Sequence, residues 1–219
     1  MKKLITSILG LILICFSANS VERKIGVTAA FTNFESSGTE TMKSNGDKTS
    51  ADVSESVIVP SLFFEITSDA GLGIGVDFIP SDADIGSKSK TKVDIDTDDT
   101  ADNGGTNKAS AVVSGHQTIY LRIPVKAAFL KLGYVDADIE TTENLATGTT
   151  YGNKSVNGTM ISIGFDRDLP KGTFLRAELA HTDYDDITLK GSSDTDGVNN
   201  KVDADVDATS LRFSIGKVF

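Results

Sequence analysis

The chain has 219 residues, a formal charge of −10, a mean hydropathy of −0.08, one cysteine and no tryptophan. Its length fits one ordinary domain, and its mean hydropathy excludes a bundle of membrane-spanning helices. The acidity argues against a nucleic-acid partner, which needs a basic face on the protein. A single cysteine excludes an internal disulfide and a zinc site built from several cysteines.

Residues 1–20 predict a secretory signal peptide. Two lysines form its charged start, Leu4 to Phe16 form an apolar run, and Ala18-Asn19-Ser20 form a cleavage site with small residues. The apolar run is too short for a helix that spans a bilayer. We therefore expect an exported protein whose mature chain begins at Val21.

The mature chain, residues 21–219, alternates apolar and polar residues with the period of a strand that has two different faces. In the first such segment, Ile25 and Val27 fall on one face and Lys24 and Thr28 on the other. The pattern predicts eight strands, near residues 24–34, 57–67, 72–80, 116–125, 128–137, 159–168, 173–184 and 209–219.

Two phases remain open for the fifth predicted strand. Leu130, Leu132 and Tyr134 define an apolar face of even-numbered residues, whereas from Val135 to Ile139 the apolar residues are odd-numbered. The alternation by itself does not show whether the strand slips by one residue at this point.

The connections between the predicted strands alternate between long and short. Long polar segments cover residues 35–56, 81–115, 138–158 and 185–208, and the other three connections are tight turns. An even strand number with short turns at one end and long loops at the other is typical of transmembrane β-barrels. Strands of about 9–11 residues also suffice to cross a bilayer.

The sequence therefore predicts an all-β fold, an eight-stranded antiparallel up-and-down transmembrane β-barrel. A soluble exported β-sandwich also has alternating strands, but it does not require the many Gly, Ser and Thr residues of the polar face. In the last long segment, Val202, Ala204 and Val206 alternate with aspartates, which predicts a final hairpin that continues as strand above the membrane.

If the apolar face meets lipid, the polar face fills the lumen with charges of both signs. An eight-stranded barrel is only wide enough for its side chains to fill, and unpaired charges there are costly. We predict a structural network of salt bridges, with a gated ion path as the alternative; a wide pore needs about 16–18 strands. The predicted network consists of Lys24, Glu65, Asp77, Arg122, Lys131, Asp166, Arg176, Glu178 and Arg212.

Several short motifs resemble the small outer-membrane barrels of the OmpA-like and opacity-protein-like type. The segment TFLRAELAHTDYDD, residues 173–186, resembles the penultimate strand of that family. Lys131-Leu-Gly-Tyr134 and Ser162-Ile-Gly-Phe165 resemble its glycine-containing strands. The end of the chain is similar to the family's C-terminal assembly signal, in which Lys217 departs from the usual aromatic or apolar residue. The residues that match this signal are Leu211, Phe213, Ile215 and Phe219.

The resemblance implies a location in the outer membrane of a Gram-negative cell. It implies contacts with outer-membrane lipid and lipopolysaccharide, recognition by the outer-membrane assembly machinery, and extracellular partners bound through the loops. No peptidoglycan-binding domain follows the predicted barrel in this chain, so anchoring to the cell wall is not implied.

Two groups of residues are candidates for chemistry. Ser114 and His116 are two residues apart, hence expected on one strand face, and His181 lies near Asp183 and Asp185. Some outer-membrane barrels are lipid-modifying enzymes or proteases with such residues, but a catalytic site also needs an orienting carboxylate and oxyanion donors within reach. Because the sequence identifies neither, we predict no enzymatic activity and no cofactor.

The acidic stretches Asp94–Asp99 and Asp194–Gly197 raise the question of calcium. An EF-hand loop has Gly at position 6 and Glu at position 12; counted from Asp94, Asp99 and Gly105 occupy these places. We therefore predict no metal site, and weak association of divalent cations with the loops stays open.

These observations predict a structural or envelope-integrity role, or a surface-interaction role through four long acidic extracellular loops. Two alternatives stay open, a narrow ion or small-solute channel and an envelope lipid-modifying enzyme. The loop ligand and the oligomeric state are left open by the sequence.

Overall fold

The computed structural model describes residues 21–41, 46, 48–80, 83–92, 105–144, 150–192 and 201–219. The predicted signal peptide, residues 1–20, and both acidic stretches considered for calcium lie outside the described residues. No helix in the described part of the chain is long and apolar enough to cross a membrane.

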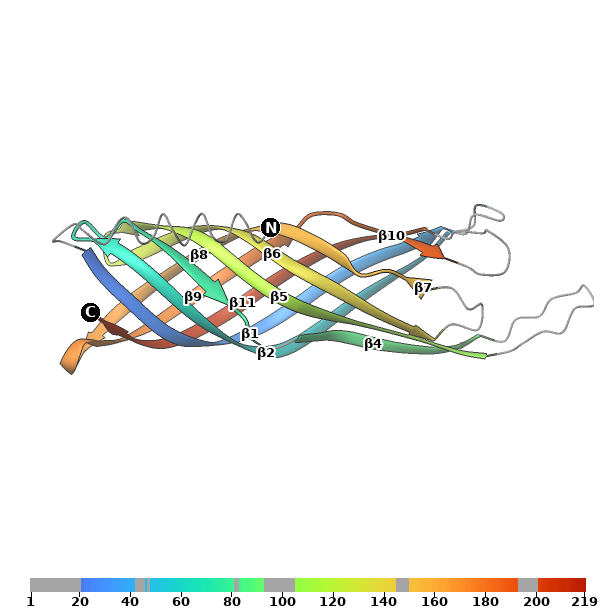
Figure 1. Ribbon diagram of the computed structural model, residues 1–219, viewed down its shortest axis with the longest axis horizontal. Coiled ribbons are helices and arrows are strands. Elements are labelled where there is room, and N and C mark those ends of the chain that lie inside the picture. The colour runs from blue at the N-terminus through green and yellow to red at the C-terminus, as the bar shows by residue number, and fades with distance from the viewer. Residues whose placement is uncertain are drawn as a thin grey trace, which may run out of the picture.

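The described strands form a sheet that closes on itself (Figure 1). The ring has the order β1-β2-β3-β5-β6-β8-β9-β11, and β1 pairs with β11 to close it. This ring of antiparallel neighbours confirms the predicted eight-stranded up-and-down barrel. Its strands are β1 (Val21–Thr41), β2 (Lys48–Ser68), β3 (Gly73–Phe78), β5 (Gly105–Val125), β6 (Ala128–Asn144), β8 (Lys154–Leu169), β9 (Thr173–Tyr184) and β11 (Lys201–Val218).

Three further short strands lie at one end of the barrel. β4 (Ala83–Lys92) pairs with β5, β10 (Ile187–Ser192) pairs with β11, and β7 (Thr150–Tyr151) pairs with β10. The opposite end, on the left of Figure 1, carries the three tight turns; one of these is the 3-10 turn Pro170–Gly172. The short-turn end and the long-strand end therefore differ as predicted.

The strands run further than the sequence indicated. β1 pairs with β2 from Val21↔Ser68 to Thr41↔Lys48, and a strand of this length extends for roughly 70 Å. A bilayer core of about 30 Å needs less than that even at a tilt near 45°. Much of the segments predicted as long loops is therefore strand that continues beyond the membrane. The alternation predicts a strand only as far as its outer face is apolar, whereas backbone pairing between strands does not require an apolar outer face.

Outward-facing apolar side chains form a belt around the part of the barrel next to the short turns. The exposed fractions of Ile25, Ile161, Ile163 and Ile215 are each 52%. An apolar surface of this extent on a folded protein marks a contact with a membrane or partner. Other members of the belt are Val27, Phe31, Ile58, Leu62, Ile74, Phe78, Leu121, Val125, Leu132, Tyr134, Phe165, Leu175, Leu179, Leu211 and Phe213.

In β6 the two faces of the strand exchange polarity above this belt without a slip in phase. In β6, Leu132 and Tyr134 point outward, and the next outward residue, Asp136, is polar. On the inner face, Lys131 is followed by Val135, which is fully buried, and then by other buried apolar residues. The structure therefore settles the open phase of this strand: the apolar residues after Tyr134 point into the barrel.

Candidate functional site

The nine charged side chains of the predicted network all point into the lumen, and each of the eight ring strands contributes at least one of them. Glu65, Arg176 and Glu178 are at most 3% exposed. The alternation explains this placement, because each charge has the parity opposite to the apolar belt. The structure brings all nine into ion pairs: five of the charges form one linked group, and the other four form two separate pairs.

Arg176 is the centre of the largest group. Its Nη2 donates to Glu65 Oε1 at 2.7 Å, and its Nε donates to Asp166 Oδ1 at 2.7 Å. Arg122 joins the same two acids, through Nη2 to Asp166 Oδ2 at 3.1 Å and Nε to Glu65 Oε1 at 3.7 Å. The hydroxyl of Tyr120 also donates to Glu65, at 3.0 Å. A forked guanidinium suits this role because it can bind two carboxylates at once.

The other charges attach to this group or lie beside it. Lys131 Nζ is 2.8 Å from Glu178 Oε1, which also accepts a hydrogen bond from Ser162. Arg212 pairs with Asp77 from β11 to β3. Lys24 reaches Asp166 at 3.4 Å. Most of these pairs join strands that are not neighbours in the ring, so the side chains cross the lumen.

Aromatic rings pack against the cations of this network. Phe63, Phe129 and Phe174 each have the Arg176 guanidinium within 5.0 to 5.4 Å of the ring centroid. Lys131 Nζ lies 4.3 Å from the centroid of Tyr120. Such contacts between cations and ring faces are attractive. The predicted site did not include these rings.

The glycines on the inner face of the strands are the sequence signal that could have predicted the positions of these rings. A Cβ on Gly26 would lie 2.6 Å from Phe63, and one on Gly75 would lie 2.4 Å from Tyr120. Gly164 and Gly216 make the corresponding close approaches to Phe129 and Phe174, respectively. Each ring therefore occupies the space that a glycine on an adjacent strand leaves free, an arrangement known to stabilise sheets.

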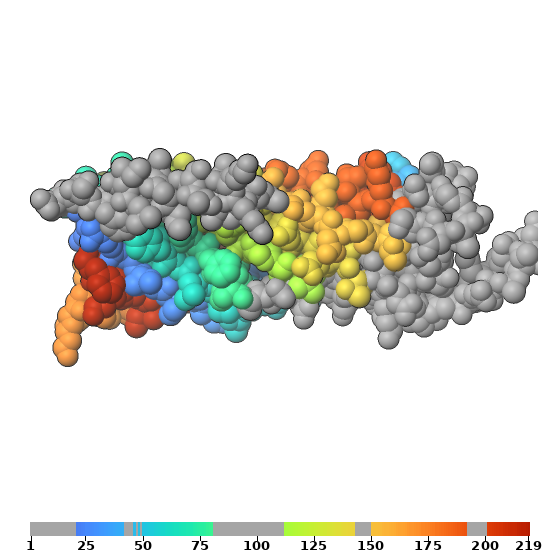
Figure 2. Space-filling view, in the orientation of Figure 1, coloured from blue at the N-terminus to red at the C-terminus, as the bar shows by residue number. Residues whose placement is uncertain are grey.

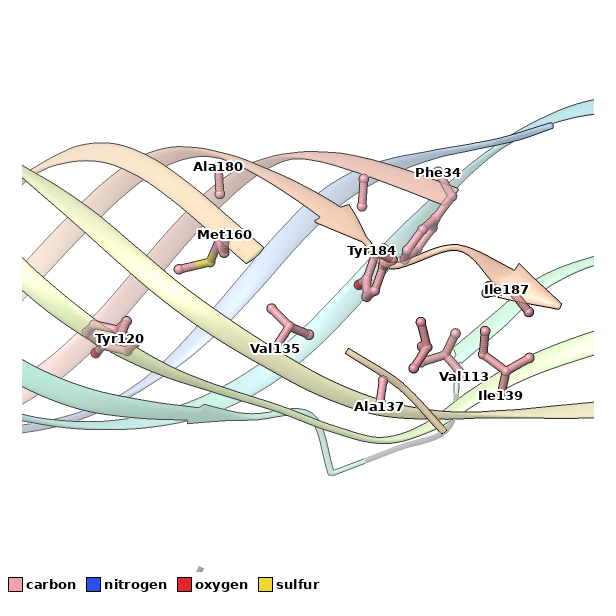
Figure 3. Close-up of a cluster of buried hydrophobic side chains, with 12 residues drawn as sticks. Phe34, Val113, Tyr120, Val135, Ala137, Ile139, Met160, Ala180, Tyr184 and Ile187 are labelled. Atoms are coloured by element: carbon pink, nitrogen blue, oxygen red, sulfur yellow. The ribbon is translucent and has the colours of Figure 1, made fainter. Parts of the chain in front are cut away.

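Above the ion pairs the lumen becomes apolar. Figure 3 shows the side chains of this cluster pointing into the barrel, from Tyr120 and Met160 to Val113 and Ile139. Where the two regions meet lies a cavity of about 40 Å³, large enough for ordered water. His116 Nδ1 and Arg212 Nε, both on its lining, have no hydrogen-bond partner among the described residues.

Ser114 and His116 do not share a strand face, contrary to the expectation from their spacing. The pairing of β5 with β6 shifts between Ser114 and Gln117, and Gly115 in between has a φ of +60°. Ser114 donates to Glu140 at 2.9 Å on the outer face, whereas His116 Nε2 lies 3.1 Å from the Tyr184 hydroxyl on the inner face. A β-bulge reverses the phase in this way.

The second histidine, in contrast to His116, lies on the outside. His181 is exposed and forms a hydrogen bond with Thr209 at 3.1 Å, next to the exposed Asp183. Among the described residues, no group of three or more His, Cys, Asp or Glu is placed to hold a metal ion. Further out, hydrogen bonds from Lys201 and Thr188 lower the pKa of the Asp203 carboxyl.

The four residues that match an assembly signal are on the outer face of β11 and at its end. Leu211, Phe213 and Ile215 belong to the apolar belt, and Phe219 is 67% exposed. Lys217 shares this face, with its Nζ 5.6 Å from the Phe219 ring centroid. All of them are therefore accessible from the lipid side.

An apolar belt outside, a charged lumen inside and short turns at one end define the fold of a small outer-membrane β-barrel. OprG from Pseudomonas aeruginosa has a similar structure, with a TM-score of 0.61 and 18% identity over 91% of this chain and 96% of that one. The protease OmpT from Escherichia coli gives a TM-score of 0.51 and 7% identity over 93% of this chain and 98% of that one. At these identities the likeness concerns the fold. No family model and no curated protein sequence matches the chain.

Proposed function

We propose that this protein is a closed outer-membrane barrel with a structural and surface-interaction role. The observation that carries this proposal is the position of Arg176, held across the lumen by Glu65 and from the neighbouring strand by Asp166, at 2.7 Å each. Removing one member of such a buried network leaves the others as uncompensated charges, which is costly. The network therefore resists the rearrangement that ion flow would need.

The outer end supports the surface-interaction part of the proposal. Above the belt, the outward residues are polar and acidic, and Asp207 lies directly opposite both Glu35 and Asp183 on its two neighbouring strands. Here the barrel itself, rather than long loops alone, presents charge to the outside. We infer that this acidic wall meets extracellular molecules and that lipopolysaccharide, which is itself anionic, contacts the apolar belt below it.

The remaining sequence hypotheses belong to the same proposal. Kinship with the OmpA-like and opacity-protein-like barrels is supported by β9, where Arg176 and Glu178 of the segment that resembles the family's penultimate strand face the lumen. Recognition by the assembly machinery is supported by the exposure of Phe213 and Phe219. A non-enzymatic role is supported by the separation of Ser114 from His116 on opposite faces of the wall.

We expect the purified, refolded protein to show no single-channel conductance in a planar bilayer at any applied voltage. The reason is that ion pairs and aromatic rings fill the narrow lumen near Arg176. A general porin measured in the same bilayer provides the positive control. Steady openings that disappear when the protein is omitted would favour the narrow channel and contradict the closed barrel.

We expect outer-membrane extracts to contain the protein in a form that migrates differently in SDS gels with and without boiling. Folded barrels resist the detergent because every ring strand is hydrogen-bonded to a neighbouring strand on each side. Recovery in the soluble periplasmic fraction without such a shift would contradict the membrane location.

A further inference from the structure

Among the described residues, four exposed cations lie at the short-turn end of the barrel, between the β5–β6 turn and the end of β11. Lys126 and Lys171 lie in tight turns, Arg167 lies near the end of β8, and Lys217 lies near the end of β11. None of these four side chains makes an ion pair or a hydrogen bond with any residue that the structure describes. We call these four residues the basic collar. Figure 2 shows the orange hairpin around residue 171 and the red end of β11 together at this end.

The backbone at the two turn lysines is an independent observation. Lys126 has a φ of +55° and Lys171 a φ of +65°, and they are the two non-glycine residues with positive φ in the described part of the chain. The left-handed region costs an ordinary residue energy that glycine does not pay. Lysine thus occupies both positions where a glycine would fit the turn with less strain. Strained residues of this kind indicate a role beyond the turn itself.

The position of the basic collar next to the apolar belt indicates which part of the membrane it contacts. Val125 next to Lys126 is 44% exposed, and Phe165, two residues before Arg167, is 58% exposed. Ile215 stands in the same relation to Lys217. Long basic side chains at the edge of an apolar belt keep their stems on apolar surface and extend their charges to the lipid headgroups.

Nearby acidic residues only partly balance the collar. Glu22 is engaged with Lys24 at 3.5 Å, and Asp69 and Asp168 are the other carboxyl side chains in the terminal turns and strand ends. The opposite end of the barrel is acidic, with Asp207, Glu35 and Asp183 side by side. Anions are therefore attracted to the short-turn end and repelled from the other.

We propose that the basic collar binds the phosphate groups of anionic phospholipids in the leaflet next to the short turns, which in barrels of this layout faces the periplasm. The ligand is the lipid headgroup, since the cations are spread along the edge of the belt from the β5–β6 turn to the end of β11 and are not gathered into a pocket. Basic residues close to an anionic membrane surface are attracted to it. This proposal goes beyond the closed barrel and does not depend on whether the lumen conducts.

The test compares the thermal midpoint of the SDS-gel shift for protein refolded in two kinds of vesicle, phosphatidylcholine alone and an equal mixture with phosphatidylglycerol. For the wild type we expect phosphatidylglycerol to raise the midpoint by about 5 °C or more at low salt. The variant K126Q/R167Q/K171Q/K217Q should lose most of this shift. High salt should also remove it, because salt screens exposed charges.

The matched control is K48Q/K154Q/K190Q/K201Q, which removes four cations at the acidic end. It should retain the full shift. Inorganic phosphate added to phosphatidylcholine vesicles at the same ionic strength should have no effect, which separates a headgroup from free phosphate. Equal shifts in the wild type and the collar variant, no shift in the wild type, or a shift with phosphate alone would overturn the proposal.

A second variant, K126G/K171G, separates lipid binding from turn stability. Relief of the positive-φ strain should leave its midpoint in phosphatidylcholine equal to or above that of the wild type. Its response to phosphatidylglycerol should nevertheless be smaller, because two of the four cations are gone. A full response in this variant would show that the turn lysines do not bind lipid.

Discussion

Arg176→Ala is expected to destabilise the barrel by about 3–5 kcal/mol, the usual cost of breaking a buried ion pair from one side. Arg176 is 2% exposed and Glu65 is fully buried, so the loss of the guanidinium leaves a carboxylate without its main partner. Asp166 loses the same partner but keeps Arg122 at 3.1 Å. The free energy of unfolding is measured in urea with the protein in phosphatidylcholine vesicles, and the gel shift monitors how much of it is folded.

Two controls distinguish the network from a general effect of losing an arginine. Arg167→Ala removes an exposed arginine without an ion pair to the described residues and should change the free energy of unfolding by about 0.5 kcal/mol or less. Glu65→Gln/Arg176→Met removes both charges and should cost at least about 1 kcal/mol less than the two single changes together. Strict additivity would show that Glu65 and Arg176 do not act as a pair.

Gly26→Ala is expected to destabilise the barrel by about 1–3 kcal/mol through overpacking. An added Cβ would lie 2.6 Å from Cε1 of Phe63 and 2.7 Å from the carbonyl oxygen of Ile215. The ring cannot simply move away, because it packs edge-on against Phe174 at 6.1 Å and has the Arg176 guanidinium 5.0 Å from its centroid. The same unfolding measurement in urea reports the effect.

Gly38→Ala, in the same strand, is the matched control. A Cβ there would find no atom closer than 3.9 Å, so the change should be close to neutral or slightly stabilising. Gly26→Ala/Phe63→Leu should recover part of the loss, because a smaller side chain leaves room for the added methyl group. Equal changes in the free energy of unfolding from alanine at Gly26 and at Gly38 would mean that the space Gly26 leaves for the Phe63 ring does not contribute to stability.

The membrane part of the barrel could be predicted because its two faces impose opposite demands on alternate residues. Lipid requires apolar residues such as Ile25 and Val27 outside, and a narrow lumen requires small residues and paired charges such as Lys24 inside. The residues of the charge network could be identified for the same reason, since their parity is fixed by the belt. Their partners could not, because Arg176 meets Glu65 from a strand that is distant both in sequence and in the ring.

The part above the membrane was harder to predict because the rule changes there. Water surrounds the wall, so apolar residues turn inward, and Val135 and Ile139 follow Lys131 on the same face. If apolar residues are assumed to face outward along the whole strand, this change looks like a slip in register. The part of each strand beyond the membrane then looks like a loop. The bulge at Gly115 has a similar effect, since one added residue reverses the face of Ser114.

The sequence by itself determined the strand number, the closed antiparallel barrel and the set of charges in its lumen, because alternation and connection length are local properties of the chain. Only the tertiary structure decided the ion-pair partners, the ring that fills the space above each inward glycine, the length of the barrel beyond the belt and the collar of cations at its short-turn end. These features depend on the strands that closure brings together and on their register, and no local pattern contains that information.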